Sequence, residues 1–443
     1  MPELRTITES SHLARTIAVR LAKRAHDVMR RLARRPLPMV LLRDQQPLTE
    51  SELHRANSII DWIEQVIEAR PEYLERHRLS ETIHCPQAIW ALDKGEGLYD
   101  GFRAVCSRDP KVLNHLRLWT QHFTGYRLLS MELAEGRPFP RPQDIDASVD
   151  EKLLALGAAP DFGVGRYLRL SGKLPLYLRI SPPHRLGEIG WNVDGRTVSY
   201  DNYVYLERLA MMHECGVIDR LRQITAAGRT PFLIEIGGGF GGLAYHLARI
   251  IPKARIVIVD IPESLIFSSL YLSLLLPKRA HVLVSPAVAR QPFVPESPGC
   301  TFVPNYLFDR LVETGPKFDL AINTLSMSEM DAPQVAYYCR GIDQLLSDEG
   351  VFFEQNQDNA ALGRLDARTV IAQHFRYRQD LQSRLVGPLT QGTAHLWGKQ
   401  VLPPFGEHRP ARPAGFRPAT KHREFHSQSA PNSRVDRIHS SSQ

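Results

Sequence analysis

Residues 232–242 read Phe-Leu-Ile-Glu-Ile-Gly-Gly-Gly-Phe-Gly-Gly. The first half is an apolar run of the kind that forms a buried β-strand. The second half is rich in glycine, which lets the backbone turn tightly and approach a ligand closely. A second apolar run, at 256–259, ends in Asp260. Strand, glycine turn and second strand in this order predict the first βαβ unit of a nucleotide-binding domain.

The alternation of strand and helix continues to residue 354. We expect strands at 232–236, 256–260, 281–285, 318–323 and 351–354, and helices at 241–251, 263–276 and 332–347. Such alternation predicts an α/β fold with a parallel, doubly wound sheet, which binds its ligand at the carboxyl ends of the strands. Four polar residues fall at such ends: Glu235, Asp260, Asn323 and Glu354.

The glycines fit two cofactor-binding patterns. Gly237, Gly239 and Gly241 satisfy G-x-G-x-G, whereas Gly237, Gly239 and Gly242 satisfy the dinucleotide pattern G-x-G-x-x-G. Asp260 fits both patterns, because an acid that ends the second strand can hold ribose hydroxyls.

Glu235 separates the two candidate cofactors. A dinucleotide would place its pyrophosphate at this turn, where a carboxylate repels it. S-adenosylmethionine has no phosphate and carries an ammonium and a sulfonium, which a carboxylate attracts. The sequence therefore favours S-adenosylmethionine, with an NAD-dependent oxidoreductase as the alternative.

The composition is that of a globular protein large enough for two or three domains, with 443 residues, 43% of them hydrophobic and 23% charged. The five cysteines are scattered and never in C-x-x-C spacing, which argues against a disulfide scaffold and suits the cytoplasm. No H-E-x-x-H motif or similar cluster indicates a metal site. We expect neither a membrane-spanning segment nor a signal peptide.

The net charge of +7 is concentrated at the two ends of the chain. Residues 12–35 hold eight Lys or Arg and one Asp, and residues 403–443 hold seven Lys or Arg and three acids. The part between them is slightly acidic, so we expect no specific binding of nucleic acid by the core.

Four regions are expected. Residues 1–36 form a basic amphipathic helix, 37–200 a mainly helical domain, 201–402 the cofactor-binding domain and 403–443 a disordered basic tail. Two interpretations of the first helix stay open. It either docks weakly on its own protein as a solvated helix or makes a weak contact with a membrane surface.

Within the helical domain, apolar residues over 53–69 recur on one stripe and predict a helix. Short strands are expected between 167 and 200, with a hairpin turn at Asp194-Gly195, which supplies positive φ angles. Asp201 is expected to cap a helix that runs past Ile218.

The segment 231–360 resembles a class I S-adenosylmethionine-dependent methyltransferase. More narrowly, Asp-Ile-Pro-Glu at 260–263 and Asn-Thr-Leu-Ser-Met-Ser-Glu-Met at 323–330 resemble the sugar O-methyltransferase family. The resemblance implies a Rossmann-like methyltransferase sheet, S-adenosylmethionine as the cofactor, and a hydroxyl of a sugar or glycoconjugate as the methyl acceptor.

By that resemblance, Glu235 and the glycines line the methionine end of the cofactor, Asp260 takes the ribose hydroxyls and Ile261 flanks the adenine. The cofactor-binding residues that we expect are Glu235, Gly237, Gly238, Gly239, Gly241, Asp260, Ile261 and Asn323.

Glu329 is the candidate general base. The related plant-type O-methyltransferases have a histidine after the fourth strand, where this sequence has Ser326-Met327. A sugar hydroxyl reacts faster when a nearby group accepts its proton, and Glu329 is the nearest group able to do so. In the competing interpretation, Glu329 only stabilises the N-terminus of the helix at 332.

Other side chains are weaker candidates. We expect His246 to be packed or solvated and not catalytic. We expect Tyr203 and Tyr205 to pack within the core, with a position over the cofactor as the alternative, and His374 or His395 to replace Glu329 only if it is not the base. A third function is a non-catalytic Rossmann-like scaffold whose basic ends bind a membrane or a polyanion, although the glycines and both acids are intact.

Overall fold

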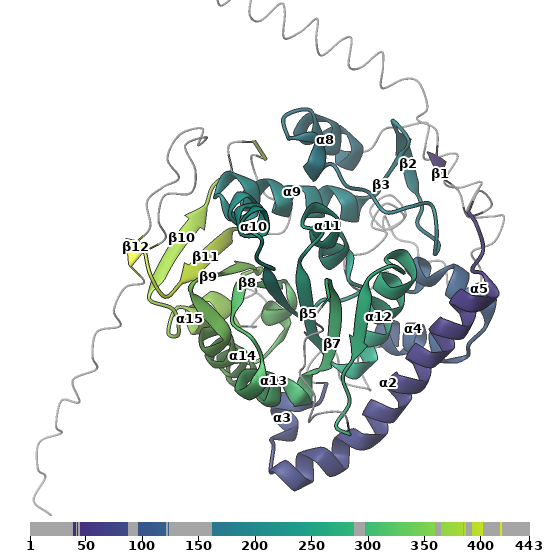
Figure 1. Cartoon of the computed structure of the whole chain (residues 1–443), viewed down its shortest axis with the longest axis horizontal. Coiled ribbons are helices and arrows are strands. Elements are labelled where there is room, and N and C mark those ends of the chain that lie inside the picture. Colours follow the sequence, from purple (N-terminus) through teal and green to yellow (C-terminus); the bar gives the residue numbers. More distant parts are fainter. Residues whose placement is uncertain are drawn as a thin grey trace, which may run out of the picture.

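A computed structural model of the chain describes residues 39–40, 42, 45–86, 96–120, 123, 162–287, 297–358, 365–383, 385–386, 392–401 and 417–418 (Figure 1). The predicted N-terminal helix, and the predicted tail except for residues 417–418, lie outside these ranges.

A nine-stranded sheet forms the centre of the described part, in the order β12-β10-β11-β9-β8-β4-β5-β7-β6. Its strands are β4 (Phe232–Ile236), β5 (Arg255–Asp260), β6 (Ala280–Leu283), β7 (Gly299–Pro304), β8 (Phe318–Thr324), β9 (Leu346–Gln355), β10 (Tyr377–Leu381), β11 (Ala394–Gly398) and β12 (Arg417–Pro418). The strands from β6 to β9 in this order pair in parallel. The predicted α/β, doubly wound fold is confirmed.

The sequence analysis did not foresee the antiparallel strands at one edge of the sheet. Strand β11 pairs antiparallel with both β9 and β10, and β12 pairs antiparallel with β10. The sequence reasoning also missed β7, which lies between β5 and β6. Four prolines between residues 284 and 298 precede it and obscure the strand–helix rhythm.

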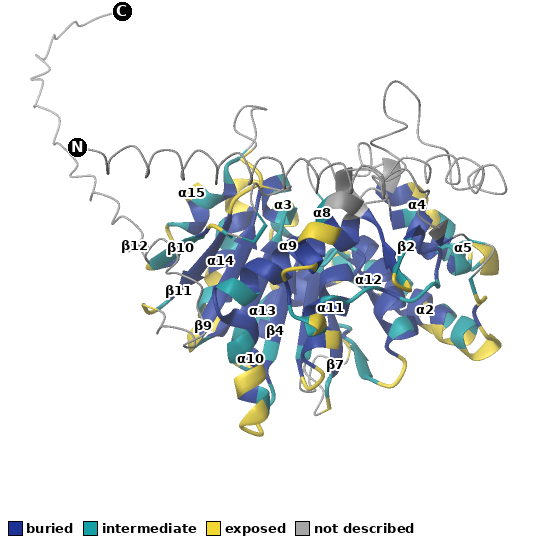
Figure 2. Ribbon diagram, turned by 90° about the horizontal axis from the view of Figure 1, so that it is seen from above, coloured by how far each residue is buried: buried dark blue, intermediate teal, exposed yellow. Residues whose placement is uncertain are grey.

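Both faces of the sheet are covered, which explains why its central strands are continuously apolar. Along β5, Ile256 and Ile258 belong to one buried cluster, and Val257 and Val259 belong to the other. The helices of the first cluster are α9 (Tyr200–Glu214), α10 (Val217–Ala226), α11 (Gly242–Ile250) and α12 (Pro262–Leu275). Those of the second are α13 (Phe308–Thr314), α14 (Ala332–Leu345) and α15 (Ala367–Ile371). Figure 2 shows the buried strands between these layers.

Helix α12 is buried on all sides, from Pro262 to Leu274. An apolar helix of this kind needs a second covering layer. Two N-terminal helices, α2 (Glu50–His77) and α4 (Glu96–Cys106), supply it. Arg70 on α2 also forms two hydrogen bonds with the Glu263 carboxylate, at 3.1 and 2.8 Å. The same buried cluster thus continues across residue 200, and the division of the chain there stays a prediction.

The expected helix over 53–69 is confirmed and is longer than predicted. Thr49 and Glu52 form a capping box at the start of α2, and Arg78 ends the helix with a φ of 52°. Two short helices follow nearby, α3 (Glu81–His84) and α5 (Pro110–Asn114).

The expected strands between 167 and 200 are confirmed only in part. Residues up to Ser171 belong to helix α8 (Phe162–Ser171), and 176–178 form a 3-10 turn. The hairpin is present as β2 (Gly190–Val193) and β3 (Arg196–Val198), with φ angles of 50° at Asp194 and 76° at Gly195. Strand β1 (Met39–Val40) pairs with β2.

The prediction that Asp201 caps the next helix is wrong. Ser199 is the N-cap of α9, and its side chain accepts a hydrogen bond from the Asn202 N–H. Asp201 instead forms an ion pair with Arg117 at 2.6 Å. The helix also stops at Glu214, because Gly216 adopts a φ of 83° before α10 begins.

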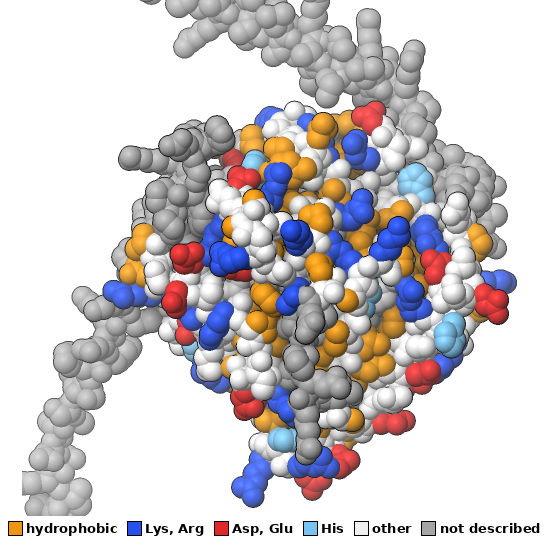
Figure 3. Space-filling model, in the orientation of Figure 1, with side chains coloured by type: hydrophobic (Ala, Val, Ile, Leu, Met, Phe, Trp, Pro, Cys, Tyr) orange, Lys and Arg blue, Asp and Glu red, His pale blue; other side chains and the backbone are white. Residues whose placement is uncertain are grey.

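The described surface mixes charges. In the orientation of Figure 1, Lys and Arg side chains lie among apolar and acidic ones (Figure 3). Among the helices that the structure describes, none is both long and apolar enough to cross a bilayer.

Candidate functional site

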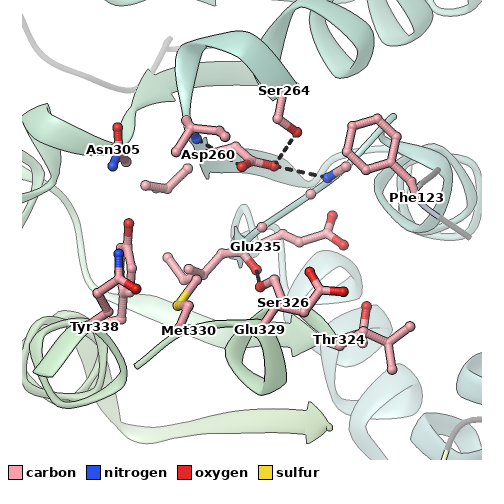
Figure 4. A pocket seen from close by; sticks show the side chains of 18 of the residues that line it. Phe123, Glu235, Asp260, Ser264, Asn305, Thr324, Ser326, Glu329, Met330 and Tyr338 are labelled. Atoms are coloured by element: carbon pink, nitrogen blue, oxygen red, sulfur yellow. Dashed lines mark hydrogen bonds between the residues drawn. The ribbon is translucent and has the colours of Figure 1, made fainter. Parts of the chain in front are cut away.

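A pocket lies at the carboxyl ends of β4, β5 and β8, where the strand order reverses direction (Figure 4). This is the position at which doubly wound sheets bind ligands. The pocket encloses about 1060 Å³ of space, including its open mouth. Its walls come from the glycine turn, from the segment between β8 and α14, from α9 and from the N-terminal region.

At Gly237 and Gly238 the glycine turn leaves no room for a side chain. Gly237 has a φ of 73°, and a Cβ built on it would lie 2.1 Å from the Oγ of Ser326. Gly239 has a φ of 53° and lines the pocket together with Gly237 and Gly238. Gly241, with a φ of 84°, is the N-cap of α11 and does not line the pocket. The predicted turn therefore exists, and three of its four predicted glycines face the ligand space.

Asp260 is held with its carboxylate at the rim of the turn. One oxygen, Oδ2, accepts hydrogen bonds from the Gly239 N–H at 3.1 Å and the Ser264 hydroxyl at 2.9 Å. The other, Oδ1, accepts one from the Ile261 N–H at 2.8 Å. Burial nevertheless raises the pKa of Asp260 to about 6. Ile261, which the family resemblance assigns to the adenine, lines the pocket beside it.

Glu235 is a buried acid with an unused oxygen. Its side chain lines the pocket and is 3% exposed, and Oε2 has no hydrogen-bond partner within the described part of the chain. Burial raises the pKa of Glu235 to about 8, against the opposing effect of the Arg208 charge. An uncompensated buried carboxyl is costly, so this group is suited to a cationic ligand.

Asn305 lines the pocket, directly after β7. Its Nδ2 donates to the carbonyl oxygen of His84 at 2.9 Å, whereas its Oδ1 has no partner among the described residues. Figure 4 shows Asn305 and Tyr338 on one side of the cavity, with Glu235 and Phe123 toward the other. Sequence reasoning missed Asn305 because it missed β7.

The predicted ligand residue Asn323 does not line the pocket. Its Nδ2 donates to the Ile236 carbonyl oxygen at 2.8 Å and to the Ser326 hydroxyl at 2.5 Å. Its Oδ1 accepts from the Met327 N–H at 3.2 Å. Asn323 therefore fastens β4 to the segment after β8, behind the glycine turn.

Glu329 lies in the pocket wall and is half-buried. It ends a 3-10 turn, η7 (Ser326–Glu329), which follows Leu325. Leu325 has a φ of 72°, a strained conformation for a residue with a side chain. Such strain is concentrated at functional sites, and here it directs the turn that carries Glu329 into the cavity.

The N-terminus of α14 is capped without Glu329. The Asp331 side chain accepts from the Gln334 N–H at 3.0 Å, and the Gln334 side chain accepts from the Asp331 N–H at 3.3 Å. These two bonds satisfy the donors that a cap serves, so the purely structural interpretation of Glu329 has less support.

No histidine lies among the described residues that line the pocket. His246 packs within α11, with Nδ1 2.7 Å from the Gly242 carbonyl oxygen, and burial lowers its pKa to about 4. His395 pairs with Glu354 at 2.6 Å inside the sheet. His374 follows α15 and also lies outside the pocket.

Sequence reasoning did not single out two lining residues, Phe123 and Arg208, and it preferred a core position for a third, Tyr205. Phe123 comes from the N-terminal region and faces Gly239, where an added Cβ would lie 3.4 Å from the Phe123 ring. Tyr205 and Arg208 come from α9. Tyr203 and Tyr205 are both buried, as expected. Within the described ranges, no group of three or more His, Cys, Asp or Glu side chains is placed to hold a metal ion.

Comparison with protein-family models gives no match, and comparison with curated proteins gives none either. Several solved structures are similar to part of this chain. The N-methyltransferase NodS from Bradyrhizobium japonicum WM9, in complex with S-adenosyl-L-homocysteine, is 13% identical, with 41% of this chain and 83% of that chain covered and a TM-score of 0.26.

An O-methyltransferase family protein from Burkholderia thailandensis is 12% identical, with 45% and 60% covered and a TM-score of 0.29. Magnesium protoporphyrin IX methyltransferase from Synechocystis PCC 6803, with bound S-adenosyl-L-homocysteine, is 13% identical, with 53% and 92% covered and a TM-score of 0.27.

Proposed function

We propose that this chain is an S-adenosylmethionine-dependent O-methyltransferase. The observation that carries the proposal is the unpartnered Oε2 of Glu235 in the wall of the pocket. The cofactor's ammonium and sulfonium are the kind of charge that this buried acid requires. Two other groups fit the same ligand: Asp260 for the ribose hydroxyls, and the unpartnered Oδ1 of Asn305 for the adenine amino group.

The pocket favours this cofactor over NAD. A pyrophosphate at the glycine turn would lie beside Glu235 and Asp260, and two carboxyl groups near a dianion are unfavourable unless both are protonated. The alternative of a non-catalytic scaffold gains no support, because a scaffold has no need of the buried acid. We keep both alternatives as outcomes of the binding experiment below.

For the chemistry, S-adenosylmethionine supplies an activated methyl group, and the protein contributes mainly positioning. We assign Glu329 as the general base that accepts the proton of the attacking hydroxyl. Its place on η7 supports this role, because Figure 4 shows it on the cavity wall below Glu235 and Asp260.

The acceptor that we propose is a hydroxyl of a sugar or glycoconjugate. This rests on the resemblance of segments 260–263 and 323–330 to the sugar O-methyltransferase family. Both segments contribute to the pocket, through Asp260 and Ile261 and through Ser326 and Glu329. We also propose a cytoplasmic location, in keeping with five free cysteines, and no specific nucleic-acid partner.

The test is calorimetry on the full chain, because the N-terminal region lines the pocket and a 201–402 fragment would lack that wall. S-adenosylmethionine and S-adenosylhomocysteine should bind, and NADH should not. Glu235→Gln, which keeps the size of the side chain, should weaken both ligands. Binding of NADH alone would establish the oxidoreductase, and binding of none of the three would favour the scaffold.

A further inference from the structure

Arg208 is a buried cation whose hydrogen-bonding capacity is only partly used. It lies on α9, lines the pocket and is 1% exposed. Its Nε donates to the Oε1 of Gln355 at 2.9 Å, whereas its Nη2 has no partner within the described part of the chain. A guanidinium donor left unpaired in a buried site is costly, so a ligand that supplies an acceptor there stabilises the site.

Glu235, the buried acid in the same pocket, does not form a hydrogen bond with the unpaired Nη2 of Arg208. Glu235 lines the same pocket, and its Oε2 is also without a partner among the described residues, so these two atoms do not bond each other. Arg208 acts on Glu235 only through space, by lowering its pKa against the effect of burial. The pocket therefore holds an acidic oxygen, Oε2 of Glu235, and a cationic N–H donor, Nη2 of Arg208, that are both available to hydrogen-bond a ligand.

An amino-acid zwitterion matches this pair of groups. Its ammonium offers donors to Glu235, and its carboxylate offers acceptors to the planar guanidinium of Arg208. S-adenosylmethionine carries such a zwitterion at one end. We propose that Arg208 binds the carboxylate of the cofactor's amino-acid tail, so that the site selects cofactor forms that retain this carboxylate. The inference rests on the function proposed above.

The guanidinium is positioned before any ligand arrives. Gln355, at the end of β9, accepts from Nε of Arg208 and donates from its own Nε2 to the Gly392 carbonyl oxygen at 3.1 Å. The Arg208 carbon Cζ also lies 5.8 Å from the centre of the Tyr205 ring. A side chain fixed in this way loses little entropy when it binds, which favours selectivity.

The experiment compares two ligands that differ only in the carboxylate: S-adenosylhomocysteine and its decarboxylated analogue, S-adenosyl-3-thiopropylamine. Calorimetry on the wild-type full chain should show roughly 10- to 150-fold weaker binding of the analogue, the range for loss of a charge-assisted hydrogen bond. In Arg208→Gln, S-adenosylhomocysteine should bind about as weakly as the analogue does. The affinity for the analogue itself should change little.

Glu235→Gln is the matched control. Both ligands keep the amino group, so this substitution should weaken both alike and preserve the preference for S-adenosylhomocysteine. Arg208→Lys should keep part of the preference, because it keeps the charge without the planar geometry.

Equal binding of the two ligands by the wild type overturns the inference, and means that Arg208 faces the methyl acceptor or acts only through Gln355. This comparison needs no variant, so it holds even if Arg208→Gln fails to fold. A preference that survives in folded Arg208→Gln also overturns it. If S-adenosylhomocysteine does not bind to the wild type at all, the proposed function itself fails.

Discussion

Two walls of the pocket differ in construction. The sheet wall consists of the glycine turn, Glu235 and Asp260, and it offers charges and hydrogen bonds. The N-terminal wall consists of Ile83, Cys85, Pro86 and Phe123, and it offers mainly apolar surface. One wall thus carries the chemistry of recognition, and the other closes the space around it.

A buried ion-pair network holds Arg117, in the N-terminal region, beside the glycine turn. Arg117, six residues before Phe123, pairs with Glu188 at 2.8 Å and with Asp201 at 2.6 Å. Its guanidinium also lies 3.5 Å from the centre of the Phe240 ring, within the glycine turn. The N-terminal wall is therefore fastened to the turn itself. We expect substitutions in the sheet wall to alter turnover and affinity strongly, and those in the N-terminal wall to alter them weakly.

The largest effect should come from Glu329. If it is the base, Glu329→Gln should lower kcat by roughly 10²–10⁴-fold, while the melting temperature and cofactor affinity stay near wild type. The loss should shrink at high pH, where more of the acceptor hydroxyl ionises unaided. Turnover with each candidate sugar and thermal melting, measured on the same preparation, check this.

Asp331→Ala is the control for Glu329. It removes the N-cap of α14 two residues away and should cost about 0.5–2 kcal/mol of stability, with near-normal turnover of the folded protein. Near-normal turnover in Glu329→Gln would contradict the assignment and leave positioning alone as the source of catalysis.

Gly237→Ala should have the next largest effect. A Cβ there would lie 2.1 Å from the Ser326 Oγ at a φ of 73°. Since about 1–2 kcal/mol of left-handed strain adds to this clash, we expect S-adenosylhomocysteine to bind roughly 100-fold more weakly or worse. Calorimetry and circular dichroism separate lost binding from lost fold.

Gly195→Ala is the control for Gly237→Ala, because it introduces left-handed backbone strain without a steric clash. Gly195 has a φ of 76° on the β2–β3 hairpin, and its Cβ would meet nothing within 4 Å. It should lower stability by about 1–2 kcal/mol and leave affinity unchanged. If Gly237→Ala behaves in the same way as Gly195→Ala, the turn does not form the binding site.

The two walls also differ in how far the sequence predicts them. Glu235, the glycines and Asp260 belong to two consecutive strands and the turn between them, so their proximity follows from local chain geometry. Gly238, Ile261 and Glu329 line the pocket as predicted, and the hairpin at Asp194-Gly195 forms as its turn chemistry requires.

The residues that sequence reasoning missed depend on long-range packing. Asn305 reaches the pocket only because β7 inserts beside β5, and Phe123 only because the N-terminal region packs over the turn. Arg208 lies on the helix before the motif, where nothing local indicates a ligand. The prediction that Asp201 caps α9 failed because the Asp201 carboxylate pairs with Arg117, and Ser199 caps the helix instead.

The pH dependence of binding tests the charge of the sheet wall. The pKa of Glu235 is about 8 without ligand, so the acid is mostly neutral at pH 6. A bound ammonium favours the charged form, lowers this pKa and releases a proton. Affinity for S-adenosylhomocysteine should therefore rise by up to roughly 25-fold between pH 6 and 7.5, the limit that linkage sets when the pKa in the complex lies well below 6.

Calorimetry across this range, with the buffers' ionisation enthalpies varied, also counts the released protons. In Glu235→Gln, the affinity should rise less between pH 6 and 7.5, because only Asp260, whose pKa is about 6, still changes its charge in this range. An affinity that falls as pH rises would mean that the carboxylate of S-adenosylhomocysteine, and not its ammonium, lies beside Glu235, and would overturn the role assigned to this acid.

The smallest effect is expected in the N-terminal wall, from Phe123→Ala. Phe123 packs edge-on against Phe267, with 5.5 Å between the ring centres, and faces Gly239 on the turn. It offers no charge or conventional hydrogen bond to the ligand, so its loss removes apolar contact alone. We expect S-adenosylhomocysteine affinity to fall less than about tenfold, as for the removal of part of one aromatic contact.

Phe102→Ala truncates another aromatic ring that packs on the same core but lies outside the pocket, and it should reduce stability without changing affinity. A loss for Phe123→Ala as large as that for Gly237→Ala would show that the N-terminal wall sets the conformation of the turn, and the two walls would then act as one binding unit.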